Sequence, residues 1–92
     1  MSKKKLTGGS SGYYTVKVER PTTKGNPPYI AECNDIIEAL GMTFAEGNIL
    51  KATWRTAAAR MDNGKQGTTA LYDAEKIVFF GDRLVVQASD GK

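Results

Sequence analysis

The sequence predicts a mainly α-helical domain in which three helices follow one N-terminal β-strand. Three segments place apolar residues at helical spacing, and one earlier segment alternates as a half-buried strand does. The chain has 92 residues, 40% hydrophobic and 25% charged, values typical of one small globular domain. We therefore predict a single domain over residues 13–88. A domain of this size buries only about 60% of its unfolded surface, so self-association is one way to bury more.

Composition excludes several classes of protein. The longest apolar run, Ile77 to Phe80, is far shorter than the ~20 residues that cross a bilayer, and the N-terminus lacks the apolar core of a signal peptide. The sequence thus predicts a cytoplasmic protein with no membrane association. Cys33 is the only cysteine and there is no histidine, which excludes an intrachain disulfide, a histidine acid–base relay and a histidine-containing zinc site.

The first twelve residues predict a flexible basic arm. They combine Lys3-Lys4-Lys5 with a run of glycine and serine, a composition that gains little from burial. Such an arm, with the tyrosines that follow it, could contact nucleic-acid phosphate by charge and stacking. It could equally be a solubilising tail or an artificial linker.

The segment from Tyr13 to Arg20 predicts the strand. It places Tyr14, Val16 and Val18 on one side, and Pro21 ends it. No second segment of this kind follows. The strand must therefore pair with a weakly marked segment, lie on the helices unpaired, or pair with its copy in another subunit. The third option predicts a two-fold dimer.

The first helix is predicted to open at Pro27-Pro28, because proline is well tolerated at the first helical position. Gly41 provides its C-terminal stop. Its apolar stripe consists of Ile30, Cys33, Ile36, Ile37 and Leu40.

The second helix is predicted to begin after Thr43, which forms a capping box with Glu46, and to run to about Met61. Lys51 and Arg55 occupy a stripe beside the predicted core side. That core side consists of Leu50, Trp54, Ala57, Ala58 and Met61.

The third helix is predicted to be capped by Thr68 or Thr69 and to extend to the frayed tail at Ser89. The run from Ile77 to Phe80 could belong to a helix or a strand. Helical spacing of the surrounding apolar residues favours a helix, although Gly81 weakens it by about 1 kcal/mol.

Gly47 and Asn48 interrupt the second helical pattern and mark the first candidate site. A small residue at position 47 would let a backbone or a ligand approach, and Asn48 offers both a donor and an acceptor. Lys51 and Arg55 stand on the same face and would favour an anion. The alternative is close helix packing at Gly47 beside a solvated basic face.

The same residues resemble a known family. The segments Gly47-Asn48-Ile49-Leu50-Lys51, Trp54-Arg55 and Asp73-Ala74-Glu75-Lys76, in this order, resemble the short phage proteins of the SaV-like family. They are also similar to the C-terminal part of the nucleotide kinase of short-tailed coliphages. The resemblance implies a small helical domain, phage origin, action in the host cytoplasm and a link to nucleotides without a Walker A motif. It adds weight to Asp35, Lys51, Arg55, Asp73 and Lys76.

Three further features each have two interpretations. Glu32 and Asp35, with Asp73 approaching, could hold Mg²⁺ or could form salt bridges and a solvated acidic face. The loop at 64–69 could receive a phosphate at the start of the third helix or be a plain turn. Cys33 lies on an apolar stripe, so we expect a small buried side chain rather than a nucleophile.

Two functional hypotheses follow. In the first, the chain is a nucleotide-binding module, catalytic or sequestering. Lys51 and Arg55 hold phosphate, Asn48 orients it, and Asp35 and Asp73 are orienting or metal-binding groups. The resemblance brings Lys76 into the same candidate site. In the second, the chain is a phage inhibitor of a host defence complex, such as an anti-CRISPR, that acts by protein–protein binding. No catalytic residue, resident metal or cofactor is assigned.

Overall fold

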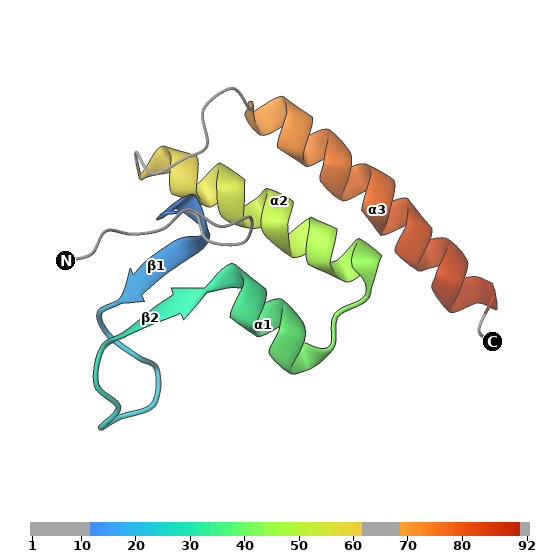
Figure 1. Cartoon of the computed structure of the whole chain (residues 1–92). Helices are drawn as coiled ribbons and strands as arrows, with labels where there is room; N and C mark the ends of the chain where they lie inside the picture. Colours follow the sequence, from blue (N-terminus) through green and yellow to red (C-terminus); the bar gives the residue numbers. More distant parts are fainter. Residues whose placement is uncertain (1–11, 62–68, 91–92) are drawn as a thin grey trace.

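The computed structural model describes residues 12–61 and 69–90 and confirms a mainly α fold with three helices (Figure 1). A short two-stranded antiparallel sheet precedes the helices. The predicted basic arm, apart from Gly12, and nearly all of the loop at 64–69 lie outside the described residues. In chain order the elements are η1 (Gly12–Tyr14), β1 (Thr15–Val18), β2 (Tyr29–Glu32), α1 (Cys33–Leu40), α2 (Phe44–Arg60) and α3 (Ala70–Asp90).

The predicted strand finds its partner inside the chain. β1 pairs antiparallel with β2, from Thr15 opposite Glu32 to Val18 opposite Tyr29. The expected helix start at Pro27-Pro28 is therefore wrong, because the segment after the prolines is extended and the helix begins at Cys33. Pairing along the β1 edge outweighs helical spacing in this short segment. It also removes the reason for expecting a dimer through β1.

The ends of the helices follow the local signals of the sequence. Gly41 ends α1 with a φ of 64°, the left-handed conformation that glycine adopts readily. The capping box of α2 is formed. The Glu46 amide donates to Thr43 Oγ1 over 3.3 Å, and the Thr43 amide donates to Glu46 Oε1 over 2.9 Å. At the start of α3, the Tyr72 amide donates to Thr69 Oγ1 over 3.0 Å.

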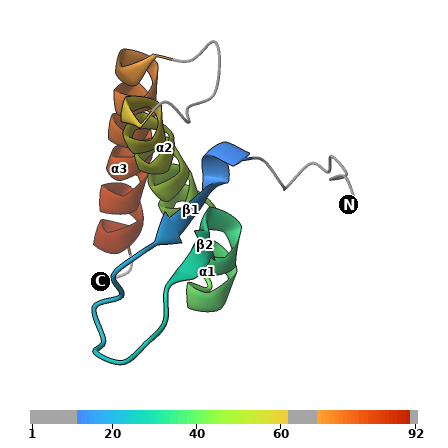
Figure 2. The same ribbon diagram turned by 90° about the vertical axis from the view of Figure 1, so that its left-hand side faces the viewer.

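The predicted core side of α2 is correct for Ala58 and wrong for Met61. α2 lies between α3 on one side and the hairpin with α1 on the other (Figures 1 and 2). Because both sides are covered, burial falls on two stripes rather than on one. Met61, expected in the core, is 70% exposed, whereas Leu50 and Trp54 are half-buried. The buried residues of α2 are Ala45, Gly47, Ala52, Arg55 and Ala58.

α3 is one continuous helix that includes the ambiguous run and Gly81. It lies antiparallel to α2 (Figure 1). The Phe44 and Phe80 rings meet edge to face with centroids 5.6 Å apart, and Asp73 contacts Arg55. Asp73 and Phe80 are seven residues apart, so one stripe of α3 packs on α2.

The apolar side chains that are buried in the described part of the chain are all small: Cys33, Ala45, Ala52 and Ala58. Small residues let helices approach closely but remove little apolar area from water. Many of the larger apolar side chains therefore retain substantial exposure, and two groups of them form the surfaces described below.

Candidate functional site

Arg55 and Asp73 form the most buried polar group of the structure, with exposed fractions of 6% and 2%. Arg55 Nε and Nη2 donate to Asp73 Oδ1 over 3.1 and 2.7 Å. Arg55 Nη1 donates to the Tyr14 hydroxyl over 2.8 Å, and the Thr56 hydroxyl donates to Asp73 Oδ2 over 3.4 Å. We call Tyr14, Arg55, Thr56 and Asp73 the Arg55 cluster. It ties η1, α2 and α3 together.

In the Arg55 cluster, the charges of Arg55 and Asp73 are paired with each other. Burial lowers the pKa of Arg55, but hydrogen bonds to Asp73 and Tyr14 outweigh this effect, so the net pKa lies above its ordinary value. An incoming phosphate would have to displace Asp73 from Arg55. The displaced carboxylate would then be buried without its partner, which costs about 3–5 kcal/mol. The geometry therefore supports a structural role for this pair.

The other residues of the predicted phosphate site have separate surroundings. Asn48 Nδ2 donates to the Phe44 carbonyl oxygen over 2.8 Å, one turn earlier in α2. Lys51 Nζ lies 6.0 Å from the centroid of the Tyr14 ring, at the edge of the Arg55 cluster. Its charge also reaches Cys33, where it partly offsets the rise in pKa that burial causes. Among the predicted residues, the structure thus places Lys51 beside Tyr14, whose hydroxyl accepts from Arg55.

Asp35 and Lys76 are placed elsewhere. Asp35 is exposed on the first turn of α1. Lys76 lies over the ring of Tyr72, with Nζ 5.6 Å from the ring centroid, on α3. Across residues 12–61 and 69–90, no three acidic or cysteine side chains cluster as a metal site would require. Glu32, Asp35 and Asp73 therefore do not assemble into a carboxylate site for Mg²⁺. None of the described helices combines the length and apolarity needed to cross a membrane.

Gly47 lies where α1 packs on α2. A Cβ at this position would lie 3.5 Å from Ile37 Cγ2, an ordinary contact distance. This position is buried against α1 rather than open to a ligand. Helix packing at Gly47, the second of the two interpretations, is present, although the contact leaves room for a Cβ and does not require a glycine.

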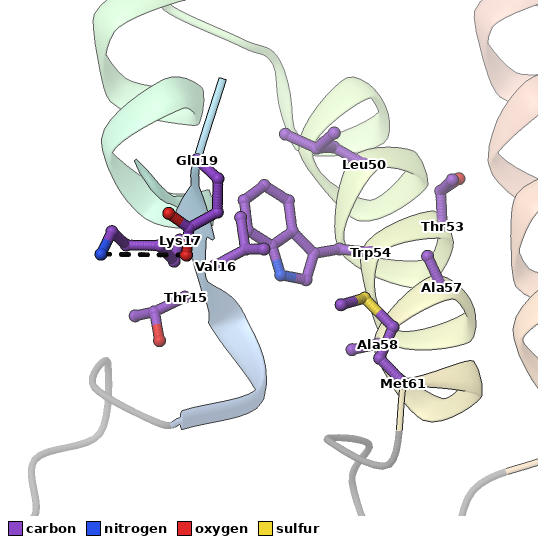
Figure 3. A pocket seen from close by; sticks show the side chains of 10 residues that line it. All are labelled: Thr15, Val16, Lys17, Glu19, Leu50, Thr53, Trp54, Ala57, Ala58 and Met61. Atoms are coloured by element: carbon purple, nitrogen blue, oxygen red, sulfur yellow. Dashed lines mark ion pairs between the residues drawn. The ribbon is translucent and has the colours of Figure 1, made fainter. Parts of the chain in front are cut away.

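An apolar pocket of about 610 Å³ lies between β1 and α2 (Figure 3). The Trp54 indole projects from α2 toward Val16, and Leu50 and Met61 extend the apolar surface along the helix. At the rim, Lys17 Nζ and Glu19 Oε2 pair over 3.9 Å. The full lining consists of Thr15, Val16, Lys17, Glu19, Leu50, Thr53, Trp54, Ala57, Ala58 and Met61.

Sequence reasoning identified most of these side chains but assigned them to a closed core. Leu50, Trp54 and Met61 share one stripe of α2, and Val16 is on the apolar side of β1. The signal that was missed is the lack of enough apolar sequence to cover that stripe. One four-residue strand beside it leaves the stripe partly open.

Comparison of the chain with protein-family models, with curated proteins and with solved structures finds no match. The resemblance to short phage proteins of the SaV-like family therefore stays a prediction based on the residues quoted above.

Proposed function

We propose that this chain is a non-catalytic protein-binding module, a phage protein that blocks a host complex in the host cytoplasm by docking on its surface. The observation that carries the proposal is the apolar pocket around Trp54. A pocket of about 610 Å³ is large enough for one or two apolar side chains of a partner. The class of partner follows from the chemistry of the lining.

The lining favours an uncharged, apolar segment of a protein. Leu50, Trp54 and Met61 provide apolar surface, and aromatic and methionine side chains are enriched where proteins bind one another. The charges at the rim, Lys17 and Glu19, are opposite and paired, so they attract neither anions nor cations strongly. A phosphate would find little to bind in this pocket.

Nucleotide binding stays a prediction for Lys51 and Asn48. Protein binding is the stronger proposal because Arg55 and Asp73 neutralise each other in a buried pair. The two hypotheses involve different side chains, so one set of variants separates them.

The experiment begins with affinity capture from a lysate of the host bacterium. We expect Met61→Glu to weaken capture of the partner about tenfold or more, because it places a charge in the apolar pocket. Met61 is 70% exposed, so this change leaves the fold intact. Leu40→Glu is the matched control, since Leu40 is also 70% exposed but lies on α1.

The captured partner is then titrated into protein labelled with 5-fluorotryptophan. Trp54 is the only tryptophan, so its ¹⁹F resonance reports on the pocket alone. A shift of this resonance on binding supports the proposal. Unchanged capture by Met61→Glu would contradict it. A nucleotide that binds in calorimetry and is lost in Lys51→Ala but kept in Met61→Glu would replace it with nucleotide binding.

A further inference from the structure

A second apolar surface covers the outer face of α3. α3 lies at one edge of the molecule, with α2 on one side of it (Figure 2). Six large apolar side chains on this helix are between 41% and 67% exposed. They form three adjacent pairs spaced seven residues apart: Leu71 with Tyr72, Val78 with Phe79, and Val85 with Val86.

A seven-residue apolar repeat is the pattern by which one helix packs along another. The repeat extends from Leu71, in the first turn of α3, to Val86, four residues before the end of this helix of 21 residues or about 31 Å. The opposite stripe, which carries Asp73 and Phe80, is already occupied by α2. A helix that is apolar on both sides is typically covered on both sides.

We propose that the outer face of α3 binds a second copy of this chain, with the two α3 helices antiparallel around a two-fold axis at Phe79. The charged residues of α3 favour a second copy of the same helix as the partner. Glu75 and Arg83 lie four residues before and after Phe79, and Lys76 and Asp82 lie three residues before and after it. Each of these two pairs has one charge of each sign.

A two-fold axis at Phe79 places every one of these charges at the level of an opposite charge. Glu75 stands opposite Arg83 of the partner subunit, and Lys76 stands opposite Asp82 of the partner subunit. The central apolar row pairs in the same register, with Phe79 opposite its own copy and Tyr72 opposite Val86 of the partner subunit. Leu71, Val78 and Val85 flank this row on one side. Self-complementarity of this kind is what a two-fold interface requires.

Other arrangements of the same two helices are less favourable. A parallel pair in register places Glu75 opposite its own copy, and Asp82 likewise. Slipping the antiparallel pair by one residue places Glu75 opposite Asp82 of the partner subunit. Like charges at close range are repulsive in both cases. The charges thus favour the antiparallel register at Phe79 over these alternatives.

Sedimentation equilibrium on the full chain under reducing conditions tests the dimer. We expect a mass of twice 10.0 kDa for the wild type and the single-chain mass for Phe79→Glu, which places two carboxylates together at the axis. Circular dichroism of Phe79→Glu should show the helical content of the wild type, as a check that this variant is folded. A wild-type mass of 10.0 kDa up to millimolar concentration overturns the proposal, as does an unchanged dimer in Phe79→Glu.

A charge exchange tests the antiparallel register. Glu75→Arg should weaken dimerisation about tenfold, because each Glu75–Arg83 attraction becomes a repulsion and occurs twice in the dimer. The exchange of both charges, Glu75→Arg with Arg83→Glu, should restore the wild-type dissociation constant to within about threefold. Glu38→Arg makes the same charge change at an exposed position of α1 and should have no effect.

Restoration by the double exchange supports the antiparallel register, since a parallel pair would gain nothing from it. Failure of the double exchange to restore the dimer overturns the register. These outcomes are independent of the pocket around Trp54. Met61→Glu should leave the dimer unchanged, so failure of either proposal can be recognised separately.

Discussion

Arg55 is the residue whose environment differs most from what its place in the sequence indicates. Its spacing from Lys51 predicts a solvated basic stripe, yet its guanidinium is buried between α2 and α3. The reason is Asp73, which lies 18 residues away and supplies the compensating charge. A buried charge is tolerated only with such a partner. Local spacing in α2 could not reveal it.

Because the Arg55–Asp73 pair is buried, the removal of either side chain alone should strongly lower the stability of the protein. Asp73→Ala should lower the free energy of unfolding by about 3–5 kcal/mol, because it leaves the Arg55 charge buried without compensation. The double change Arg55→Met with Asp73→Leu should cost less than Asp73→Ala alone. Urea unfolding at one protein concentration measures both. A cost below about 1 kcal/mol for Asp73→Ala would show that the pair is open to water.

Because the Cys33 thiol is buried, the stability of the protein should depend on pH. Burial raises the pKa of its thiol above the ordinary value of 9.0, while the charges of Lys51 and Arg55 lower it in part. The native state therefore holds this proton more tightly than the unfolded state does. This contribution to stability is present below pH 9.0 and is lost as the pH rises through the raised pKa.

The measurement compares thermal midpoints of the wild type and Cys33→Ala between pH 7 and pH 10. The variant removes the titrating group, so the wild type should lose more stability than the variant above about pH 9. Parallel curves for the two proteins would count against a buried thiol.

At the scale of elements, the neighbours that pack on α2 decide which of its residues are buried. The capping box at Thr43 and Glu46 sets where the helix begins, and α1, α3 and the hairpin each cover part of it. Alanine and glycine at the contacts let these neighbours approach. The Trp54 side of the helix is left with partial cover, and this is where the pocket forms.

Gly47→Ala tests whether the contact between α1 and α2 at this position has room for a methyl group. Gly47→Ala should stabilise the protein by about 0.5–1 kcal/mol, because alanine favours a helix and its Cβ would lie 3.5 Å from Ile37 Cγ2. Gly41→Ala is the contrasting control and should destabilise, since Gly41 has a φ of 64°. Chemical denaturation of both variants gives the comparison. A loss of stability in Gly47→Ala would mean that the contact with Ile37 is too tight.

The whole molecule buries few large apolar side chains for its length. Within the described residues, apolar burial is confined to small side chains, and many of the larger ones lie on the Trp54 pocket or the outer face of α3. Covering either surface would add buried area that a chain of 92 residues lacks by itself. The two proposals assign a partner protein to the first surface and a second copy to the other.

A dimer through α3 predicts that thermal stability depends on concentration. Dimerisation stabilises the folded state by mass action, so the melting temperature of the wild type should rise with protein concentration. Phe79→Glu should melt at a temperature independent of concentration. Differential scanning calorimetry over a hundredfold range of concentration measures this. A constant wild-type midpoint would indicate that folding and association are not coupled.

The sequence by itself predicted the three helices, the C-terminal end of α1 and the ends of α2, and it narrowed the cap of α3 to Thr68 or Thr69. These features depend on residues within about one helical turn of each other: Gly41, the Thr43–Glu46 box and Thr69. The strand at Val16 was likewise marked by its own alternation. No signal for its partner β2 was strong enough within its four residues to be recognised.

Only the tertiary structure decided which faces are buried, and the candidate site depends on that. The Arg55–Asp73 pair joins helices that are separated in sequence, and the opening beside Trp54 exists because a short strand covers that stripe incompletely. Burial depends on the area that distant elements supply, which helical spacing does not encode. The spacing therefore located the chemical groups of α2, but the packing of α3 and β1 decided which of them are available for binding.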